Sequence, residues 1–114
     1  LEFRRVLFRS ILGPKSVELM RTNAIGSISV WDRLDPAATG NLGDKFGLGF
    51  GIRSERGLTE LGSVGEFMWA GIYNTRYWMD PKEDIAIVFM SQRIPRIPEI
   101  EEKVHAAVYQ AIVK

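Results

Sequence analysis

Large apolar side chains alternate with glycines over a short stretch of the chain. Phe46, Leu48, Phe50 and Ile52 are each separated from the next by one glycine. A period of two predicts a β-strand, here with one large apolar face and one bare face. Because a bare face lets another group approach the backbone closely, we expect this strand to lie against a close neighbour.

Further apolar segments predict the rest of a sheet, with strands at residues 58–61, at residues 68–74 continuing without a turn through 75–79, and at residues 85–91. Turn residues separate these segments at 54–57 and 80–84, and the glycines of residues 62–65 suggest a flexible link. Residues 85–90 are apolar at six successive positions. Both faces of that strand should therefore be covered, as in a central strand.

A short helix is predicted before the sheet, at residues 14–22, with Pro14 in its first turn and Asn23 at its end. The next segment, residues 24–44, is rich in turn residues and reads as a loop. Its expected anchors to the core are Ile28, Val30 and Trp31.

A second helix is predicted at the C-terminal end, after Pro95 and Pro98. Its apolar positions recur on one face, which should pack on the sheet. These positions are Ile100, Val104, Ala107, Val108, Ala111 and Ile112. The pattern as a whole predicts an α+β architecture, in which an antiparallel sheet carries the C-terminal helix on one face.

Composition sets limits on the class of protein. The 114 residues are 46% hydrophobic and 25% charged, which is typical of a globular fold. No apolar run approaches the roughly 20 residues of a membrane-spanning helix. The chain lacks cysteine, which excludes disulfides and thiol nucleophiles from this segment.

The first ten residues change the interpretation of charge and extent. Residues 1–10 match, codon for codon, the translation of a widely used sequencing-adapter oligonucleotide, so we expect them to be an artefact. We expect residues 11–114 to be the natural sequence. Three arginines and one glutamate give residues 1–10 a charge of +2, which leaves −1 of the total +1 for the remainder. The charge therefore gives no indication of a nucleic-acid partner.

Most motifs that suggest chemistry are weak. The glycines at 47, 49 and 51 have the wrong spacing for a dinucleotide fingerprint, and residues 62–65 lack the first glycine of a nucleophile elbow. His105 is the only histidine. No acid–base or ligand partner is spaced to meet it, so we expect a surface or boundary residue. No acidic or histidine cluster indicates a metal site.

One tripeptide stands apart, namely Trp69, Ala70 and Gly71. With the glycine-rich segment upstream, the segments 78–81 and 85–92 and the final helix, it resembles the serine beta-lactamase-like family. That family includes class C beta-lactamases, DD-peptidases, penicillin-binding proteins and related esterases. The resemblance covers nearly all of residues 11–114 and implies that they are the C-terminal part of one domain.

The resemblance implies roles for this segment. Trp69, Ala70 and Gly71 would form the strand along which an extended substrate lies, because small side chains permit close approach. The backbone N–H of Ile72 would be one arm of an oxyanion hole. Ala70 replaces the usual glycine or hydroxyl residue, which argues against beta-lactam recognition. Asn74 stands where glycine is frequent and is a possible substrate-side residue.

The motifs that would carry catalysis in this family do not occur in the sequence. Neither Ser-x-x-Lys, which holds the nucleophile, nor its Tyr-x-Asn or Ser-x-Asn partner is present. We therefore expect the chain to be inert alone, as part of a longer enzyme that forms an acyl-enzyme with a small ester, amide or lactam. The resemblance implies no metal or organic cofactor.

Two alternatives remain. The parent could be a non-catalytic penicillin-binding-like relative that lacks the nucleophile. The chain could instead be a small β-rich module that binds single-stranded RNA through Lys45, Phe46 and Phe50, although its charge argues against this.

Overall fold

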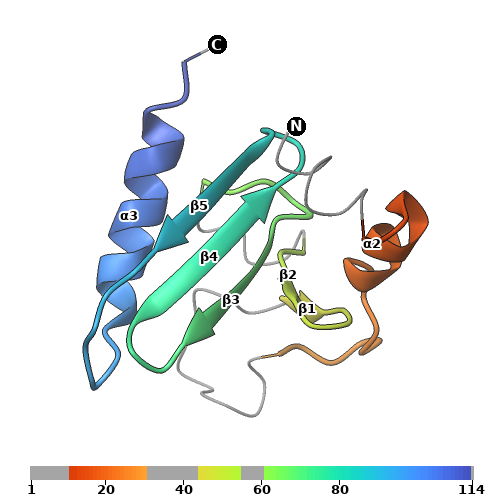
Figure 1. The fold of residues 1–114 in the computed structure, drawn as a ribbon, viewed down its shortest axis with the longest axis horizontal. Coiled ribbons are helices and arrows are strands. Elements are labelled where there is room, and N and C mark those ends of the chain that lie inside the picture. Colours follow the sequence, from red (N-terminus) through yellow and green to blue (C-terminus); the bar gives the residue numbers. More distant parts are fainter. Residues whose placement is uncertain (1–10, 31–43, 55–60, 114) are drawn as a thin grey trace.

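The computed structural model describes residues 11–30, 44–54 and 61–113. Within these ranges the elements are α2 (Pro14–Met20), β1 (Lys45–Phe46), β2 (Gly51–Ile52), β3 (Phe67–Gly71), β4 (Thr75–Asp80), β5 (Ile85–Phe89) and α3 (Pro98–Gln110). The strands form one antiparallel sheet in sequence order, from β1 to β5. Figure 1 shows α3 beside β5 and α2 at the opposite side of the molecule. The predicted α+β architecture is confirmed.

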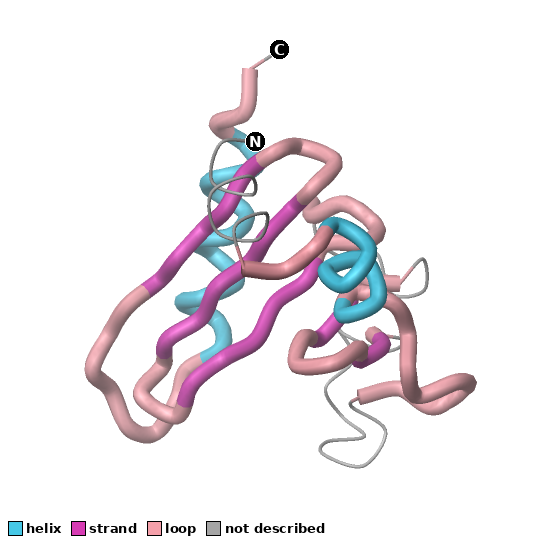
Figure 2. Tube along the Cα trace, turned by 45° about the vertical axis from the view of Figure 1, so that its right-hand side comes forward, coloured by secondary structure: helices cyan, strands magenta, loops and turns pink. Residues whose placement is uncertain are grey.

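Helix α3 covers one face of the sheet. Figure 2 shows it behind the strands, running along them. The core between the two layers contains Met68, Trp78 and Ile87 from successive strands, and Val108 and Tyr109 of α3 pack against these residues. The alternation of the strands places these three side chains on the same face, because each is paired with the next across the sheet.

The glycine-rich segment differs from the single strand that its alternation predicts. It forms a tight hairpin in which Phe46 pairs with Gly51, and the N–H of Gly47 donates to the carbonyl of Phe50 at 2.9 Å. Gly49 has φ of 106°, a conformation that glycine adopts without steric cost. The alternating pattern therefore conceals a turn that these glycines permit.

The close neighbour expected on the bare side is the chain itself. A side chain at Gly47 would overlap the carbonyl of Met20 at the end of α2, and the N–H of Leu48 donates to that same carbonyl at 3.0 Å. At Gly51, a side chain would contact the sulfur of Met68. Glycine at these positions lets α2 and β3 pack against the hairpin backbone.

The predicted face of the final helix is confirmed at Val108, which packs against the core, but the most buried positions lie about one residue away from those predicted. The residues of α3 that are fully buried are Glu101 and His105. Ile100 is 39% exposed, and Ala107 also faces solvent. The expectation that His105 lies at the surface is therefore incorrect, since it is only 1% exposed. The physical reason lies in polar partners on the sheet, which are described below.

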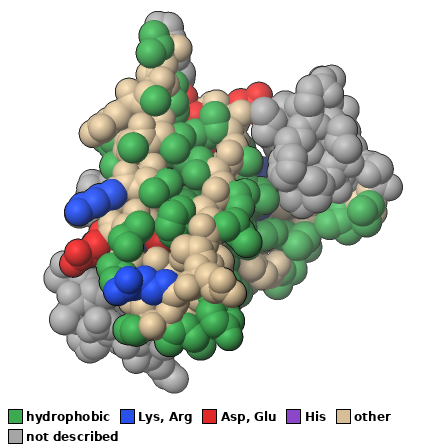
Figure 3. All heavy atoms as spheres, turned by 60° about the vertical axis from the view of Figure 1, so that its left-hand side comes forward, with side chains coloured by type: hydrophobic (Ala, Val, Ile, Leu, Met, Phe, Trp, Pro, Cys, Tyr) green, Lys and Arg blue, Asp and Glu red, His purple; other side chains and the backbone are tan. Residues whose placement is uncertain are grey.

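The prediction that β5 is a central strand is also wrong. In the described residues β5 pairs with β4 alone, which leaves it at the edge of the sheet. Ile87 is buried, but Val88 is 67% exposed and Met90 beyond the strand is 73% exposed. Figure 3 shows hydrophobic side chains gathered in the middle of the face that it presents, with lysine or arginine at one margin. The apolar run at residues 85–90 therefore forms a strand with one buried face and one exposed face.

The remaining expectations divide into three groups. The first helix, the strand at residues 75–79 and the turn at 80–84 are confirmed to within two residues. Ile28 is 56% exposed and is not a core anchor, whereas Val30 is half-buried. Trp31, the turn residues 55–57, the return strand at 58–60 and residues 1–10 lie outside the described residues.

Candidate functional site

The candidate substrate strand lies at an incompletely paired edge. β2 pairs with β3 only at Phe67 and Met68. Beyond Met68, Ala70 and Gly71 face no strand on that side within the described part of the sheet, while their other side pairs with β4. An edge of this kind can accept an extended partner through backbone hydrogen bonds.

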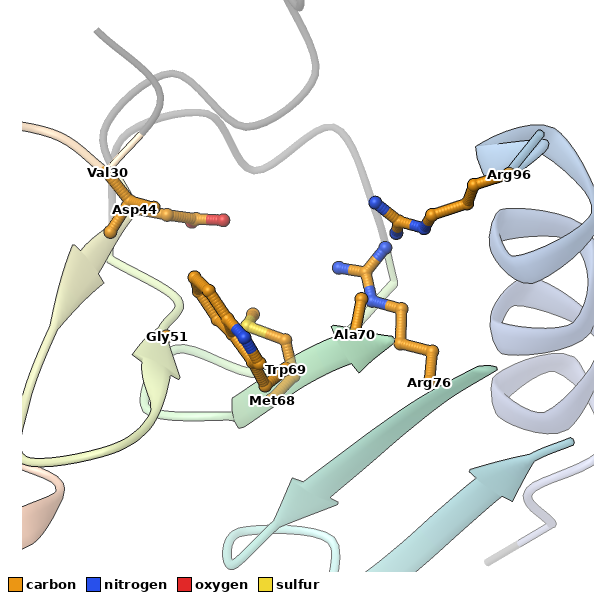
Figure 4. Close-up of a pocket in the computed structure, with 8 residues that line it drawn as sticks. All are labelled: Val30, Asp44, Gly51, Met68, Trp69, Ala70, Arg76 and Arg96. Carbon is orange, nitrogen blue, oxygen red and sulfur yellow. The ribbon is translucent and has the colours of Figure 1, made fainter. Parts of the chain in front are cut away.

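A pocket of about 160 Å³ adjoins this edge. Met68, Trp69 and Ala70 line its floor, and Asp44 and two arginines complete it. Figure 4 shows the guanidinium groups of Arg76 and Arg96 directed toward one another above Ala70, with Asp44 across the pocket. The pocket is therefore apolar at its centre and charged at its two ends.

The first and third residues of the tripeptide have clear local contacts. The ring of Trp69 is 38% exposed and meets the ring of Phe46 edge to face, with centroids 5.1 Å apart. A side chain at Gly71 would overlap the hydroxyl of Thr75 on β4. Glycine at position 71 is thus required by its cross-strand neighbour, in addition to any need for substrate access.

Ile72 and Asn74 lie in the turn between β3 and β4. The turn has three residues, since Gly71 pairs with Thr75, and the side chain of Ile72 is 72% exposed. Asn74 has φ of 63°, the left-handed conformation that closes many hairpin loops of three residues and that asparagine tolerates well. Its side chain is buried, and its amide oxygen accepts a hydrogen bond from the N–H of Ile97 at 3.1 Å. Contact between Asn74 and a substrate stays a prediction.

The two arginines of the pocket share one carboxylate. Glu101 is fully buried and accepts from Arg96 Nε at 2.8 Å and Nη2 at 2.5 Å. Its second partner is Arg76, whose Nη1 lies 3.4 Å away and whose guanidinium stacks over the ring of Trp78 at 5.0 Å. The hydrogen bonds to Glu101 raise the pKa of the Arg96 guanidinium, which therefore keeps its charge.

A second polar cluster lies beneath the sheet, and we call it the Glu66 cluster. It comprises Arg53, Glu66, Asp80, His105 and Tyr109. Glu66 Oε1 accepts from Arg53 at 2.9 Å, and its Oε2 lies 2.8 Å from Nε2 of His105. Burial alone would raise the pKa of Glu66, but hydrogen bonds from His105 and Tyr109 and the charge of Arg53 hold it below its ordinary value. The cluster therefore keeps an ionised carboxylate in the interior.

Tyr109 links the two carboxylates of this cluster. Its hydroxyl lies 2.6 Å from Glu66 Oε2 and 2.6 Å from Asp80 Oδ2. Burial, together with the two neighbouring carboxylates, raises the pKa of Tyr109. Burial would also raise the pKa of Asp80, but the hydrogen bonds from Tyr109, Ser63 and the backbone of Glu83 lower it. The cluster thus joins α3 to β4 and to the segment before β3.

Glycine makes room for this cluster. A side chain at Gly62 would meet both carboxylate oxygens of Glu66 and Nε of Arg53. Residues 62–65 were expected to be a flexible link, but Gly62 is buried against an ion pair and Gly65 adopts φ of 90° in a fixed turn. The N–H of Gly65 donates to the carbonyl of Arg53 at 2.9 Å.

Within residues 11–30, 44–54 and 61–113, no group of three histidine or acidic side chains is arranged to hold a metal ion. The helices found there are too short and too polar to cross a bilayer.

Comparison with solved structures identifies a protein of the same architecture. The structure of EstCE1, a hydrolase with promiscuous acyltransferase activity, matches with a TM-score of 0.71 and 24% sequence identity. The match covers 95% of this chain and 27% of EstCE1. The two chains share a fold. At this identity the likeness concerns the fold alone.

Curated relatives occur in Mycobacterium tuberculosis. Protein Rv1367c of strain ATCC 25618 / H37Rv and Uncharacterized protein MT1414 of strain CDC 1551 / Oshkosh are each 33% identical over 97 residues. The match covers 75% of this chain, and the chain spans 22% of the length of each relative. No protein-family model matches the sequence.

Sequence reasoning located part of this arrangement. It placed the tripeptide on a strand, which the structure confirms, but it continued that strand through Asn74, whereas β3 ends at Gly71 and Ile72 lies in the turn to β4. It missed the pocket arginines, the Glu66 cluster and the connection from Asn74 to Ile97. One available signal was asparagine at the end of a hairpin turn, which favours the left-handed conformation. Polar residues at positions 101 and 105 of a helix with apolar neighbours gave no comparable signal.

Proposed function

We propose that the chain is the C-terminal part of a serine hydrolase that acts through an acyl-enzyme on a small ester, amide or lactam. The observation that carries the proposal is the small-residue strand at an open sheet edge beside a pocket, in a fold shared with the hydrolase EstCE1. The missing nucleophile and its base belong to the rest of the protein in this proposal. The chain alone is then inert.

The strand supplies substrate contacts in the proposed reaction. An extended substrate lies along Ala70 and Gly71, with Trp69 at one side of the pocket. The N–H of Ile72 donates to the oxyanion of the tetrahedral intermediate, and the nucleophile's own N–H is the second donor. Removal of such a donor costs about 3 kcal/mol in the transition state.

The pocket supports an ester or amide in preference to a lactam. Its centre is lined by Met68, Trp69 and Ala70, which suits an apolar acyl or alcohol group. Ala70 has no hydroxyl to bind a lactam carboxylate. EstCE1 is a hydrolase with promiscuous acyltransferase activity, which is consistent with an acyl-enzyme that either water or an alcohol can resolve.

The proposal is tested on the longer protein encoded upstream of the codon for Ile11. We expect it to hydrolyse p-nitrophenyl esters and to show a covalent acyl adduct by intact mass. Ile72→Pro removes the N–H while suiting the second position of a hairpin turn, and should lower kcat/KM about 100- to 1,000-fold. Ile72→Ala keeps the N–H and is the matched control, with an expected loss of only a few-fold.

Two results would contradict the proposal. One is an extended protein that folds but forms no acyl adduct, as the non-catalytic relative would. The other is an active protein in which the proline and alanine variants have equal kcat/KM, which would remove the oxyanion role from Ile72.

A further inference from the structure

The turn that carries Ile72 is held by the segment that follows β5. The N–H of Arg93 donates to the carbonyl of Tyr73 at 3.1 Å. The hydroxyl of Ser91 lies within hydrogen-bond distance of two turn carbonyls, 3.0 Å from that of Tyr73 and 2.7 Å from that of Asn74. Both residues that follow Ile72 in the turn are therefore fixed through their carbonyl groups.

The side chain of Asn74 adds a contact in the opposite direction. It is 1% exposed, and its amide oxygen accepts from the N–H of Ile97 at 3.1 Å. Because Asn74 also has the left-handed φ of 63°, one residue both closes the turn and attaches it to the segment before α3. A polar side chain so deeply buried would be costly without this hydrogen bond.

The segment before α3 is itself anchored. Arg96, the neighbour of Ile97, makes two hydrogen bonds to the fully buried Glu101 in the first turns of α3. Glu101 also contacts Arg76 on β4 at 3.4 Å. The contacts form a continuous path from α3 through Arg96 and Ile97 to Asn74 and the turn.

We propose that Asn74 and Ser91 are positioning residues that fix the backbone N–H of Ile72. The inference rests on the proposed function, in which the N–H of Ile72 donates to the oxyanion. An oxyanion donor is effective when it is held in place before the reaction, so that no reorganisation is needed as charge develops. Asn74 then acts from beneath the turn and touches no substrate, in contrast to the substrate-side role that its position suggested.

The chain offers a matched pair of variants at position 74. Asn74→Gly keeps the left-handed conformation, which glycine adopts freely, but removes the acceptor for Ile97. Asn74→Asp keeps an acceptor and tolerates the same conformation. Ser91→Ala removes the hydroxyl that reaches both turn carbonyls. Asn23→Gly, which removes two side-chain hydrogen bonds remote from the turn, is the control.

The test is ¹⁵N NMR of the 114-residue chain, with Val88→Lys present in every sample because a charge on this exposed position of β5 should limit self-association. The chain without a further substitution is called unaltered in this test. The backbone order parameter of Ile72 should be about 0.85 in the unaltered chain and in Asn74→Asp, and should fall below about 0.6 in Asn74→Gly. Ser91→Ala should lower it in the same direction, and Asn23→Gly should leave it unchanged. Amide exchange of Ile97 should quicken about tenfold in Asn74→Gly only, because its hydrogen-bond acceptor is gone.

The outcomes separate this inference from the proposed function. If Ile97 exchanges faster in Asn74→Gly while the order parameter of Ile72 is unchanged, the contact is only structural and the inference is wrong. An unchanged Ile97 rate would also overturn it, since the hydrogen bond would then contribute nothing. The measurement needs no activity, so failure of the longer protein to hydrolyse esters would leave its result intact.

Discussion

At the scale of single residues, the Glu66 cluster shows how charge is kept inside a small fold. Glu66 is fully buried, yet both of its oxygens have donors, from Arg53 on one side and from His105 and Tyr109 on the other. A buried ion is tolerable when its partners satisfy it, and removal of one partner leaves the other uncompensated. Individual members of the cluster should therefore be sensitive to substitution.

The hydroxyl of Tyr109 can be removed alone. Tyr109→Phe keeps the ring against the core but leaves Glu66 and Asp80 each without one short contact. We expect the free energy of unfolding to fall by about 1–3 kcal/mol. Tyr73→Phe removes an equivalent hydroxyl from a half-exposed side chain and should change stability by less than about 0.5 kcal/mol. Equal effects in urea unfolding would show that the cluster is not the cause.

The pKa directions predict loss of stability in acid. The pKa values of Glu66 and Asp80 lie below their ordinary values of 4.5 and 3.8 in the folded chain. At pH values between the folded and the ordinary pKa values of these carboxyl groups, the unfolded chain therefore binds more protons than the folded chain. The resulting stability is fully present above the ordinary pKa values and is lost as pH falls through the folded ones.

Glu66→Gln provides the matching test of this pH dependence. It leaves Arg53 without its carboxylate and should cost about 3–5 kcal/mol at pH 7. The difference in unfolding free energy between the two chains should shrink as the pH falls through the folded pKa of Glu66. Glu18→Gln, at an exposed position of α2, is the control. A difference that stays constant from pH 7 to pH 3 would contradict the assigned pKa direction.

At the scale of elements, local patterns predicted more than long-range ones. The strand character of β3 and β4 was predicted, because their apolar positions form a local pattern, but the turn between them was not, since the predicted strand continued from Asn74 into Thr75. The most buried positions of α3 were not predicted either, because apolar residues at Ile100 and Val104 gave a period that fits a neighbouring face equally well. The partner that selects the buried face, Glu66, lies 39 residues before His105. The spacing of apolar residues within the helix cannot show that a buried carboxylate elsewhere in the chain will pair with His105.

The same limit explains the error on β5. A continuous apolar run predicts that both faces are covered, but it does not identify what covers them. In the described residues α3 covers one face and β5 forms the edge, with Val88 and Met90 exposed. Exposed apolar edge strands promote association between copies of a chain.

We therefore expect the 114-residue chain to self-associate, and we expect Val88→Lys to reduce this association. Residue 88 lies on the exposed face of β5, so the substitution should change the free energy of unfolding by less than about 0.5 kcal/mol. Thr75→Lys, on the same face of β4 but half-buried, gives a comparison for added charge alone. Light scattering after size exclusion measures the mass. A monomer in the unaltered chain at micromolar concentration would contradict this account of the edge.

At the scale of the whole molecule, the proposal that the chain is the C-terminal part of a larger domain would account for both the open sheet edges and the short span of the chain. The chain spans 22% of the length of each of the two Mycobacterium tuberculosis relatives and 27% of the length of EstCE1. If it is part of a larger domain, the remaining part would cover the exposed face and complete the edge of β3. The candidate strand could be predicted from the resemblance, whereas the proposed function requires a nucleophile from residues that this sequence does not contain.

The most direct test of that claim is to sequence the source DNA upstream of the codon for Ile11, without the adapter-like segment. The account predicts an open frame that continues for several hundred codons and contains Ser-x-x-Lys followed by a Tyr-x-Asn or Ser-x-Asn motif. A frame of that length without the serine would point to a non-catalytic relative. A start codon a few residues upstream would contradict the central claim, and a small β-rich binding module would become the leading explanation.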